Sequence, residues 1–309
     1  MSRVVIFIRH GVRGFPTPPS PTAPLNPEPL LLADKQNLNL FGHLHSYELG
    51  KWILSKFGKP DFLYGDVTVS RTVDTSVSIG YGAGVKEIFL SKEKTDLYFN
   101  PPAVQTVETI VATQALLKKY EDQLQKIRHV LEKFSDTGNL EKESSYNIST
   151  GFVTGLEPQA YTLGALMLLG RYGKINSPYL QCRDEISPIV PINWNLTYPT
   201  ESSVAESATS FLDGVCRCLG KYKVSVLVGH EHNAITLAKY FHQPYKVPDF
   251  PDFWIPPNSG FLFTLCGSDI GIQQLYLSPD GKFHLRDYGK VEYRKLDWNF
   301  DLQSRVINY

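Results

Sequence analysis

An uninterrupted apolar run near the N-terminus, Val4-Val5-Ile6-Phe7-Ile8, places the strongest constraint on the fold. A short run of this kind, without alternating polar residues, is typical of a strand buried on both faces of a parallel sheet. The polar segment Arg9-His10-Gly11-Val12-Arg13 follows at once. Ligands of open α/β sheets bind at the carboxyl ends of the strands, so this segment stands where a ligand would bind.

Strand and helix patterns alternate along the chain and predict the α/β class. Helical spacing over residues 38–57 follows the first strand, and a short strand at 62–64 leads to a helix that begins at Ser70. A strand at 224–228 and the helix after it repeat this order. We therefore expect a three-layer α/β sandwich with a mostly parallel central sheet.

The middle of the chain has a different pattern. Residues 103–134 are rich in Leu, Lys, Glu and Gln and contain neither Gly nor Pro, and residues 157–172 also have helical spacing. We expect residues 96–180 to form a smaller helical domain. It would be inserted into a discontinuous α/β core made of residues 1–95 and 181–309.

Two further segments present polar side chains at comparable places. The strand at 224–228 is followed by His230 and Glu231, and Arg71 lies in the first turn of a helix. The N-terminus of a helix favours an anion. Each residue alone would be an ordinary buried histidine, helix-terminal acid or surface arginine. Their joint appearance at strand ends and a helix start favours an anion-binding site.

These residue types fit the transfer of a phosphoryl group to a side chain. The transition state spreads negative charge over three equatorial oxygens, which guanidinium groups can bind with paired donors. A neutral His10 nitrogen can attack phosphorus and form a covalent phosphohistidine. Glu231 can protonate the leaving oxygen and later accept a proton from water. The residues expected to bind the phosphoryl group are Arg9, Arg13, Arg71 and His230.

This chemistry needs no magnesium ion, and we expect no metal and no other cofactor. His43 and His45 are two positions apart on a predicted helix, so their side chains point to different faces. The four cysteines lack the paired spacing of a zinc site and are too few and irregular for a disulfide scaffold. We expect ordinary, partly buried cysteines, and a single Cys182–Cys266 disulfide remains an open alternative.

Charge and hydropathy narrow the class of partner. The 31 basic and 31 acidic residues balance, so no long-range field draws the chain to nucleic acid or to an anionic membrane. No apolar run approaches the roughly 20 residues that span a bilayer. We expect a small phosphate monoester as the partner, and the sequence indicates no oligomeric state. The first apolar run does not resemble a signal peptide, which predicts a cytoplasmic chain, or a secreted or periplasmic one if this is a mature form.

Ile8-Arg9-His10-Gly11-Val12-Arg13 resembles the first motif of the histidine acid phosphatases, the branch of the histidine phosphatase superfamily that includes the phytases. Val228-Gly229-His230-Glu231-His232-Asn233 resembles the second motif, a His-Asp-x-Asn turn. Ser70-Arg71-Thr72 falls where the family has a further phosphate-binding arginine, and Pro256-Pro257-Asn258-Ser259-Gly260-Phe261 resembles its late turn into a strand. The likeness covers most of the chain outside the expected insert and is greatest to bacterial phytases and glucose-1-phosphatases.

The resemblance implies hydrolysis of phosphate monoesters, such as inositol polyphosphates or sugar phosphates, without a metal. It makes His10 the nucleophile and Glu231 the general acid. It makes Arg9, Arg13, Arg71 and His230 the phosphate-binding residues. The chain departs from the family pattern at Glu231, where bacterial members have Asp, so the geometry at the leaving group can differ. Because His10 must be neutral while Glu231 is protonated, we expect the activity to have an acidic to mildly acidic pH optimum.

Two other functions remain open at this point. A phosphotransferase of the phosphoglycerate mutase type would use the same nucleophile, but it normally has Glu or Gln where this chain has Val12, and it lacks a His-Glu pair like His230-Glu231. A non-catalytic binder of phosphate ligands would have lost His10 or the acid, and this chain keeps both.

Overall fold

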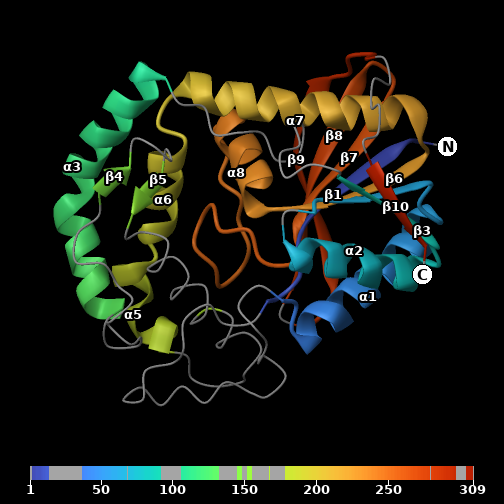
Figure 1. The fold of residues 1–309 in the computed structure, drawn as a ribbon, viewed down its shortest axis with the longest axis horizontal. Helices are drawn as coiled ribbons and strands as arrows, with labels where there is room; N and C mark the ends of the chain where they lie inside the picture. The colour runs from blue at the N-terminus through green and yellow to red at the C-terminus, as the bar shows by residue number, and fades with distance from the viewer. Residues whose placement is uncertain are drawn as a thin grey trace.

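The computed structural model describes residues 2–13, 37–67, 69–91, 106–131, 145–147, 152–154, 167, 178–278, 280–296 and 304–308. Within these residues an eight-stranded sheet has the order β10-β3-β2-β6-β1-β7-β8-β9 (Figure 1). Its strands are β1 (Val4–Arg9), β2 (Phe62–Gly65), β3 (Glu87–Ser91), β6 (Val224–Gly229), β7 (Gly260–Cys266), β8 (Asp269–Leu277), β9 (Phe283–Glu292) and β10 (Ser304–Asn308).

Half of this sheet is parallel. The neighbours β3, β2, β6 and β1 all pair in parallel, and the register sets Arg9 beside Gly229 and Gly65 beside Val228. The carboxyl ends of β1, β2 and β6 therefore meet at one edge of the sheet. This edge is where the sequence predicts the ligand site.

The expectation of a mostly parallel sheet is wrong for the other half. β7 pairs antiparallel with β1, and β8, β9 and β10 are antiparallel to their neighbours, which makes the sheet mixed. The connections explain part of this result. Only Gly267 and Ser268 separate β7 from β8, and a link this short can form a hairpin but not a parallel crossover. Gly267 has a φ of +66°, which suits such a turn.

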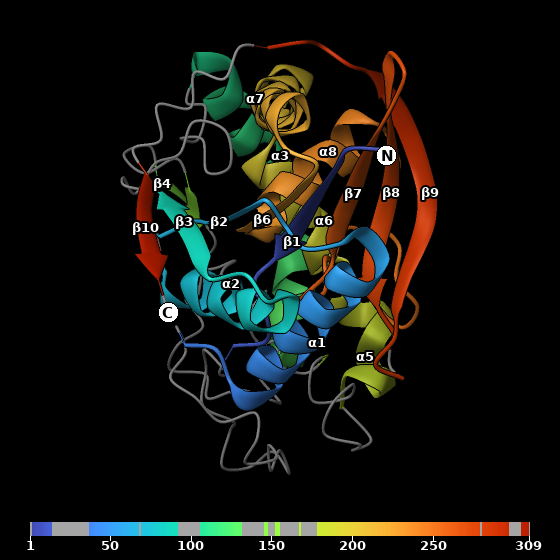
Figure 2. The ribbon, with the colours of Figure 1, turned by 90° about the vertical axis from the view of Figure 1, so that its right-hand side faces the viewer.

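Helices cover both faces of the central strands. In Figure 2, α1 (Leu40–Phe57) and α2 (Ser70–Ala83) lie on one side of β1 and β6, and α7 (Glu201–Lys221) and α8 (Glu231–Tyr240) lie on the other. Alternate residues of β1 point to these two layers. Ile6 and Ile8 pack with the helices α1 and α2, and Phe7 packs with α7. The apolar run of the first strand is thus buried on both faces, as its composition predicts.

Close backbone contact joins α1 to α2. A Cβ added to Gly82 would lie 2.0 Å from the carbonyl oxygen of Tyr47, and one added to Gly50 would lie 2.2 Å from that of Ile79. Both positions therefore require glycine. This contact holds the C-terminal part of α2, the helix that carries Arg71 in its first turn, against α1.

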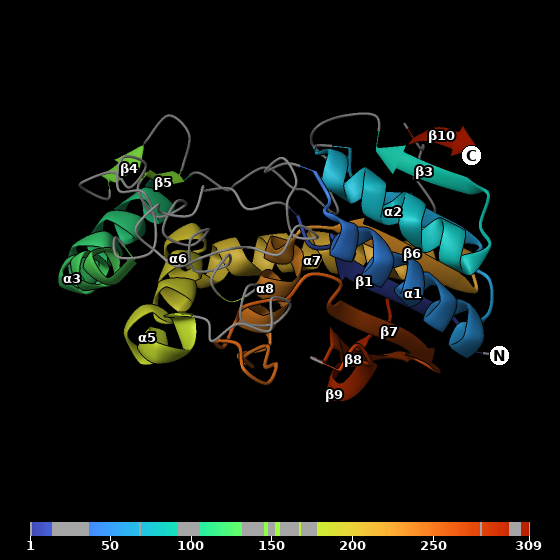
Figure 3. The ribbon, with the colours of Figure 1, turned by 90° about the horizontal axis from the view of Figure 1, so that it is seen from below.

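The remaining described helices lie together away from the large sheet (Figures 1 and 3). They are α3 (Val107–Leu131), α5 (Pro178–Ile186) and α6 (Ile189–Thr197), with a small hairpin of β4 (Ser145–Asn147) and β5 (Phe152–Thr154). The long helix predicted over 103–134 contains α3. The sequence analysis does not predict α5 and α6, and the predicted helix at 157–172 lies outside the described residues except Met167. The domain boundaries therefore stay predictions.

The described residues also show whether any helix could span a membrane and how the cysteines are placed. None of their helices combines the length and the apolar character that a membrane span requires. Cys182, Cys216 and Cys218 are buried whereas Cys266 is exposed, and the Cys182–Cys266 disulfide left open above does not form in this structure.

Candidate active site

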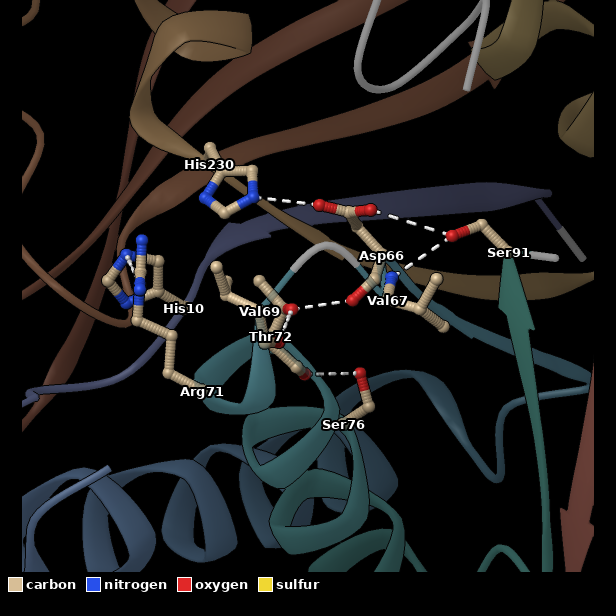
Figure 4. A network of polar contacts seen from close by, with 9 residues as sticks. All are labelled: His10, Asp66, Val67, Val69, Arg71, Thr72, Ser76, Ser91 and His230. Atoms are coloured by element: carbon tan, nitrogen blue, oxygen red, sulfur yellow. Dashed lines mark hydrogen bonds and ion pairs between the residues drawn. The ribbon is translucent and has the colours of Figure 1, made fainter. Parts of the chain in front are cut away.

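Three adjacent parallel strands end at the site. β1 is followed by His10, β6 by His230 and β2 by Asp66. Backbone bonds keep these positions in register, because the His10 amide donates to the Gly229 carbonyl at 2.9 Å and the Asp66 amide donates to the Val228 carbonyl at 3.2 Å. Figure 4 shows His10, His230 and Asp66 side by side, with Arg71 reaching in from α2.

The two ring nitrogens of His10 have different partners. Nδ1 lies 2.8 Å from the Gly11 carbonyl oxygen, which can only accept, so Nδ1 carries the proton. Nε2 accepts a hydrogen bond from Nε of Arg71 at 3.0 Å. These contacts fix one tautomer, with the proton on Nδ1 and the lone pair on Nε2. The lone pair that a nucleophile needs therefore points toward the arginine of α2.

The environment of His10 keeps its ring neutral. The pKa of His10 is lowered well below the ordinary value of 6.5, first by burial of the ring. Positive charge nearby lowers the pKa further, and the contributing neighbours, in decreasing order, are Arg71, Arg9, His230 and Arg13. Because the pKa is lowered, the ring remains neutral at acidic pH values where an exposed histidine would be protonated.

Arg71 is held by the same contact that holds the loop after β1. The hydroxyl of Thr75 donates to the Arg71 carbonyl at 2.6 Å and accepts from the Gly11 amide at 2.9 Å. Thr75 of α2 therefore joins the backbone of Gly11, next to His10, to the backbone of Arg71. The sequence analysis does not identify Thr75, because nothing in its local pattern distinguishes it from an ordinary helix residue.

Arg9 is turned toward α8. Its Nη2 forms an ion pair with Oε2 of Glu231 at 2.7 Å, and its Nη1 donates to the Ile255 carbonyl. The guanidinium carbon lies 5.4 Å from the ring centre of Trp254, which is a cation–π distance. Arg9 and Glu231, predicted to act on the same substrate, are therefore in direct contact, and Trp254 is a neighbour that the sequence analysis does not identify.

Arg13 lies at the end of the same loop. Its carbonyl accepts from the side-chain amide of Asn39, the residue that caps the N-terminus of α1, at 3.2 Å. Its charge contributes to the lowered pKa of His10. Contacts or charge effects thus link all six predicted site residues in one cluster: His10, Glu231, Arg9, Arg13, Arg71 and His230.

A buried turn contacts the segment that carries His10. The Asn258 amide donates to the Arg9 carbonyl at 3.2 Å, and its side chain donates to Ser46 Oγ at 2.8 Å. Asn258 adopts a φ of +58°, which a non-glycine residue takes only where its surroundings require it. A Cβ at Gly11 would lie 3.0 Å from Ser46 Oγ and 3.2 Å from Asn258 Oδ1. The turn at 256–260 therefore packs directly against the loop that carries His10.

His230 has a partner that the sequence analysis does not identify. Its Nε2 lies 2.7 Å from Oδ2 of Asp66, a fully buried carboxylate. Asp66 follows the strand β2 directly, and this position at the carboxyl end of a buried strand is the signal that could have revealed it. The rings of His10 and His230 meet edge to face with their centres 5.7 Å apart, and His232 stacks on His230 at 5.6 Å.

Metal ligation is not indicated by the described part of the chain, where no group of three or more His, Cys, Asp or Glu side chains is placed to hold an ion. His43 contacts Ser78 Oγ at 3.0 Å, and the ring of His45 packs against Phe41. Chemically, the site offers a neutral imidazole nitrogen, several fixed positive charges and one carboxylate at a helix N-terminus. This set can bind a dianion and attack it at its centre.

No family model and no curated protein matches the sequence. The fold, in contrast, resembles solved phytases. The phytase of Citrobacter braakii has a TM-score of 0.67 and 18% identity, covering 93% of this chain and 90% of its own. The phytase of Klebsiella sp. ASR1 has a TM-score of 0.65 and 14% identity, covering 95% and 89%. A multiple inositol polyphosphate phosphatase of Bifidobacterium longum has a TM-score of 0.50 and 10% identity, covering 92% and 87%.

These neighbours confirm, at the level of the fold, the likeness that the sequence motifs predict. The protein has a phytase-like α/β fold. Two motif segments carry this likeness, one that follows β1 and one that follows β6. Because β1 and β6 are neighbouring strands, the two segments lie at the same edge of the sheet.

The electrostatics of the site predict a measurable titration. In an NMR titration, the His10 ring should titrate well below pH 6.5, with its signals assigned by their loss in His10→Ala. Arg71→Gln removes the largest single charge acting on the ring, so the pKa of His10 should rise. The matched control is Arg3→Gln, because Arg3 binds the Leu219 carbonyl at the end of α7. A His10 that titrates at 6.5 or above, or that ignores Arg71→Gln, would contradict this electrostatic account.

Proposed function

We propose that the protein hydrolyses phosphate monoesters in two steps through a covalent phosphohistidine on His10. The observation that carries the proposal is the state of the His10 ring. It is buried, its pKa is lowered, its proton is on Nδ1, and its Nε2 lone pair lies against Arg71. A histidine prepared in this way, with several positive charges around it, suits attack on an electrophile that arrives as an anion.

In the first step the phosphoryl group is bound by Arg9, Arg13, Arg71 and His230. Nε2 of His10 attacks phosphorus, the N–P bond forms, and the bond from phosphorus to the ester oxygen breaks. The leaving oxygen takes a proton from the carboxyl group of Glu231 and departs as an alcohol. The positive charge of the side chains offsets the charge on the equatorial oxygens, so the proposal needs no metal ion.

Glu231 shares Arg9 with the substrate. In the structure its carboxylate is paired with the Arg9 guanidinium at 2.7 Å. A phosphoryl dianion that binds Arg9 competes for the same donors. We infer that substrate binding releases Glu231 from Arg9, and that the released carboxylate takes a proton from solvent and then turns toward the ester oxygen as the proton donor. Glutamate is one methylene longer than the aspartate typical of the resembling family, and this added length suits such a movement.

In the second step water replaces the alcohol. Glu231, now a carboxylate, takes a proton from the water as its oxygen attacks phosphorus. The N–P bond breaks, inorganic phosphate forms, and His10 is again neutral with its lone pair on Nε2. The protons balance over the cycle, because Glu231 gives one to the alcohol and regains one from water.

The substrate class that we propose is an inositol polyphosphate or a sugar phosphate. Two solved neighbours support this choice, the Hafnia alvei phytase in complex with myo-inositol hexakis sulphate and the Bifidobacterium longum phosphatase in complex with inositol hexasulfate. We also propose that residues 96–180 form a helical insert beside the core of residues 1–95 and 181–309. This insert would contribute to the choice of substrate.

A phosphotransferase remains the second candidate, because it would use the same phosphohistidine. The carboxylate of Glu231 at the N-terminus of α8, next to His230, favours hydrolysis, since it can activate water. A pure binder of phosphate ligands would gain nothing from a neutral nucleophile.

Phosphate release from a substrate panel tests the proposal. Phytate, glucose-1-phosphate and an aryl phosphate should each be assayed with the native protein and with His10→Ala. Loss of a nucleophile removes most catalysis, so His10→Ala should lower kcat by about 10⁴-fold or more. Binding of inositol phosphate without any phosphate release by the native protein would favour the binder, and transfer of phosphate between sugars would favour the phosphotransferase. Full turnover by His10→Ala would exclude His10 as the nucleophile.

Glu231→Gln separates proton donation from phosphate binding. For a sugar phosphate, whose leaving alcohol needs a proton, the variant should lower kcat by about 10²–10⁴-fold. For an aryl phosphate, whose leaving group is stable as an anion, the first step should lose far less. The measurement is the rate of the initial burst of leaving-group release, phenol from the aryl phosphate and free sugar from the sugar phosphate, for both proteins. Equal losses of the first step for both substrates would contradict the role of Glu231 as general acid.

A further inference from the structure

The contact between His230 and Asp66 limits what His230 can do. Asp66 follows β2 and is fully buried, and its Oδ2 lies 2.7 Å from His230 Nε2 (Figure 4). A carboxylate only accepts hydrogen bonds, so the proton of this contact belongs to Nε2. In Figure 4 the other ring nitrogen, Nδ1, faces away from Asp66, on the side where His10 lies.

Asp66 is itself held in place. Its backbone carbonyl accepts from the hydroxyl of Thr72 at 2.5 Å, and Ser91 Oγ lies 3.5 Å from Oδ1. Ser91 in turn accepts from the Val67 amide at 3.0 Å. Thr72 of α2 thus holds the backbone of Asp66, and Ser91 of β3 contacts its carboxylate. Its direction toward His230 is therefore set by the fold.

We propose that Asp66 is the positioning residue of the phosphate site: by accepting from Nε2 it orients the His230 ring and keeps Nδ1 toward the phosphoryl group. The proposal rests on the proposed function, because it assigns the partner of a phosphate-binding residue. It has a specific consequence. With Nε2 holding the proton, neutral His230 has a bare lone pair on Nδ1, and His230 donates to an anion only as the doubly protonated imidazolium.

Anion binding at this site is thus coupled to proton uptake by His230. Groups from several elements share in the balance of charge at this site. Asp66, His10 and His232 contact the His230 ring itself. Arg71 of α2 contacts His10, and Arg9 pairs with Glu231 of α8. Asp66 is hydrogen-bonded to Nε2 of His230 at 2.7 Å (Figure 4). Its removal is therefore the most direct way to change which nitrogen carries the proton.

The position of the His230 proton can be read by long-range ¹H–¹⁵N NMR of the histidine rings. In the native protein, neutral His230 should carry its proton on Nε2. Saturating inorganic sulfate, whose charge is constant near neutral pH, should protonate Nδ1 as well. A native protein whose neutral His230 holds its proton on Nδ1 would overturn the proposal without any variant. Sulfate that binds and leaves Nδ1 unprotonated would also overturn it.

Two variants of Asp66 test the role in turnover. Asp66→Leu keeps the same number of side-chain heavy atoms and has no acceptor, so Nδ1-protonated His230 should appear. The value of kcat/KM should fall about 10- to 100-fold, the loss found for partners that orient metal-binding histidines. Sulfate inhibition should weaken in parallel. Asp66→Asn keeps an oxygen that can accept from Nε2, so it should keep the native tautomer and recover most of the activity. If Asp66→Leu kept the native tautomer and the native kcat/KM, positioning by hydrogen bonding would be refuted. It would also be refuted if Asp66→Asn were as impaired as Asp66→Leu.

Asp61→Asn is the matched control. Asp61 precedes β2 as Asp66 follows it, and its carboxylate accepts from the backbone amides of Lys223 and Val224, both at 3.0 Å. This variant should leave the His230 spectrum and sulfate binding unchanged. The NMR and sulfate measurements need no turnover. If the native protein releases no phosphate, the proposed function fails while the role of Asp66 at an anion site is still tested.

Discussion

Parallel pairing of β1 with β6, and of β6 with β2, is the constraint on which the site depends. This pairing sets Arg9 beside Gly229 and Gly65 beside Val228, so the residues that follow the three strands emerge at one edge of the sheet. His10, His230 and Asp66 meet there although more than 160 residues separate His230 from the other two. A shift of register by one residue would turn each side chain to the opposite face and separate them. The apolar strands, which are buried on both faces, specify this register.

The second requirement is electrostatic. Arginines at the site favour an anion, and the same charges together with burial lower the pKa of His10. In the proposed mechanism one set of side chains therefore binds the electrophile and keeps the nucleophile neutral. Two carboxylates balance this charge locally, the partly exposed Glu231 and the fully buried Asp66. Glu231 pairs with Arg9 and Asp66 contacts His230, and these two pairs differ in purpose. In the proposed mechanism a substrate displaces the first pair, whereas the second pair lies behind the proposed phosphate site and stays in place.

Much of the site could be predicted from the sequence, because its residues lie directly after apolar strands or at helix starts. His10, His230 and Arg71 belong to such segments. Asp66 obeys the same rule, but β2 has only four residues and a lone aspartate after it also fits a turn. The Arg9–Glu231 ion pair and the contact of Trp254 with Arg9 depend on side-chain direction, which no periodicity encodes. The helix α6 has a proline, Pro191, in its first turn, where a helix tolerates proline. In the sequence this proline indicates a loop, so the helix is not predicted. Short turns after β7 and β8 make part of the sheet antiparallel. The alternation of strands and helices elsewhere in the sequence predicts parallel strands and does not reveal these turns.

The central claim is that His10 forms a bond to phosphorus during turnover. Rapid quenching of the native protein with a phosphate monoester, followed by mass spectrometry of its peptides, tests this claim most directly. The account predicts a phosphoryl group on the peptide that contains His10, stable in base and labile in acid, which forms before phosphate is released and is absent in His10→Ala. Turnover without a phosphorylated protein, or with the phosphoryl group on another residue, would contradict it.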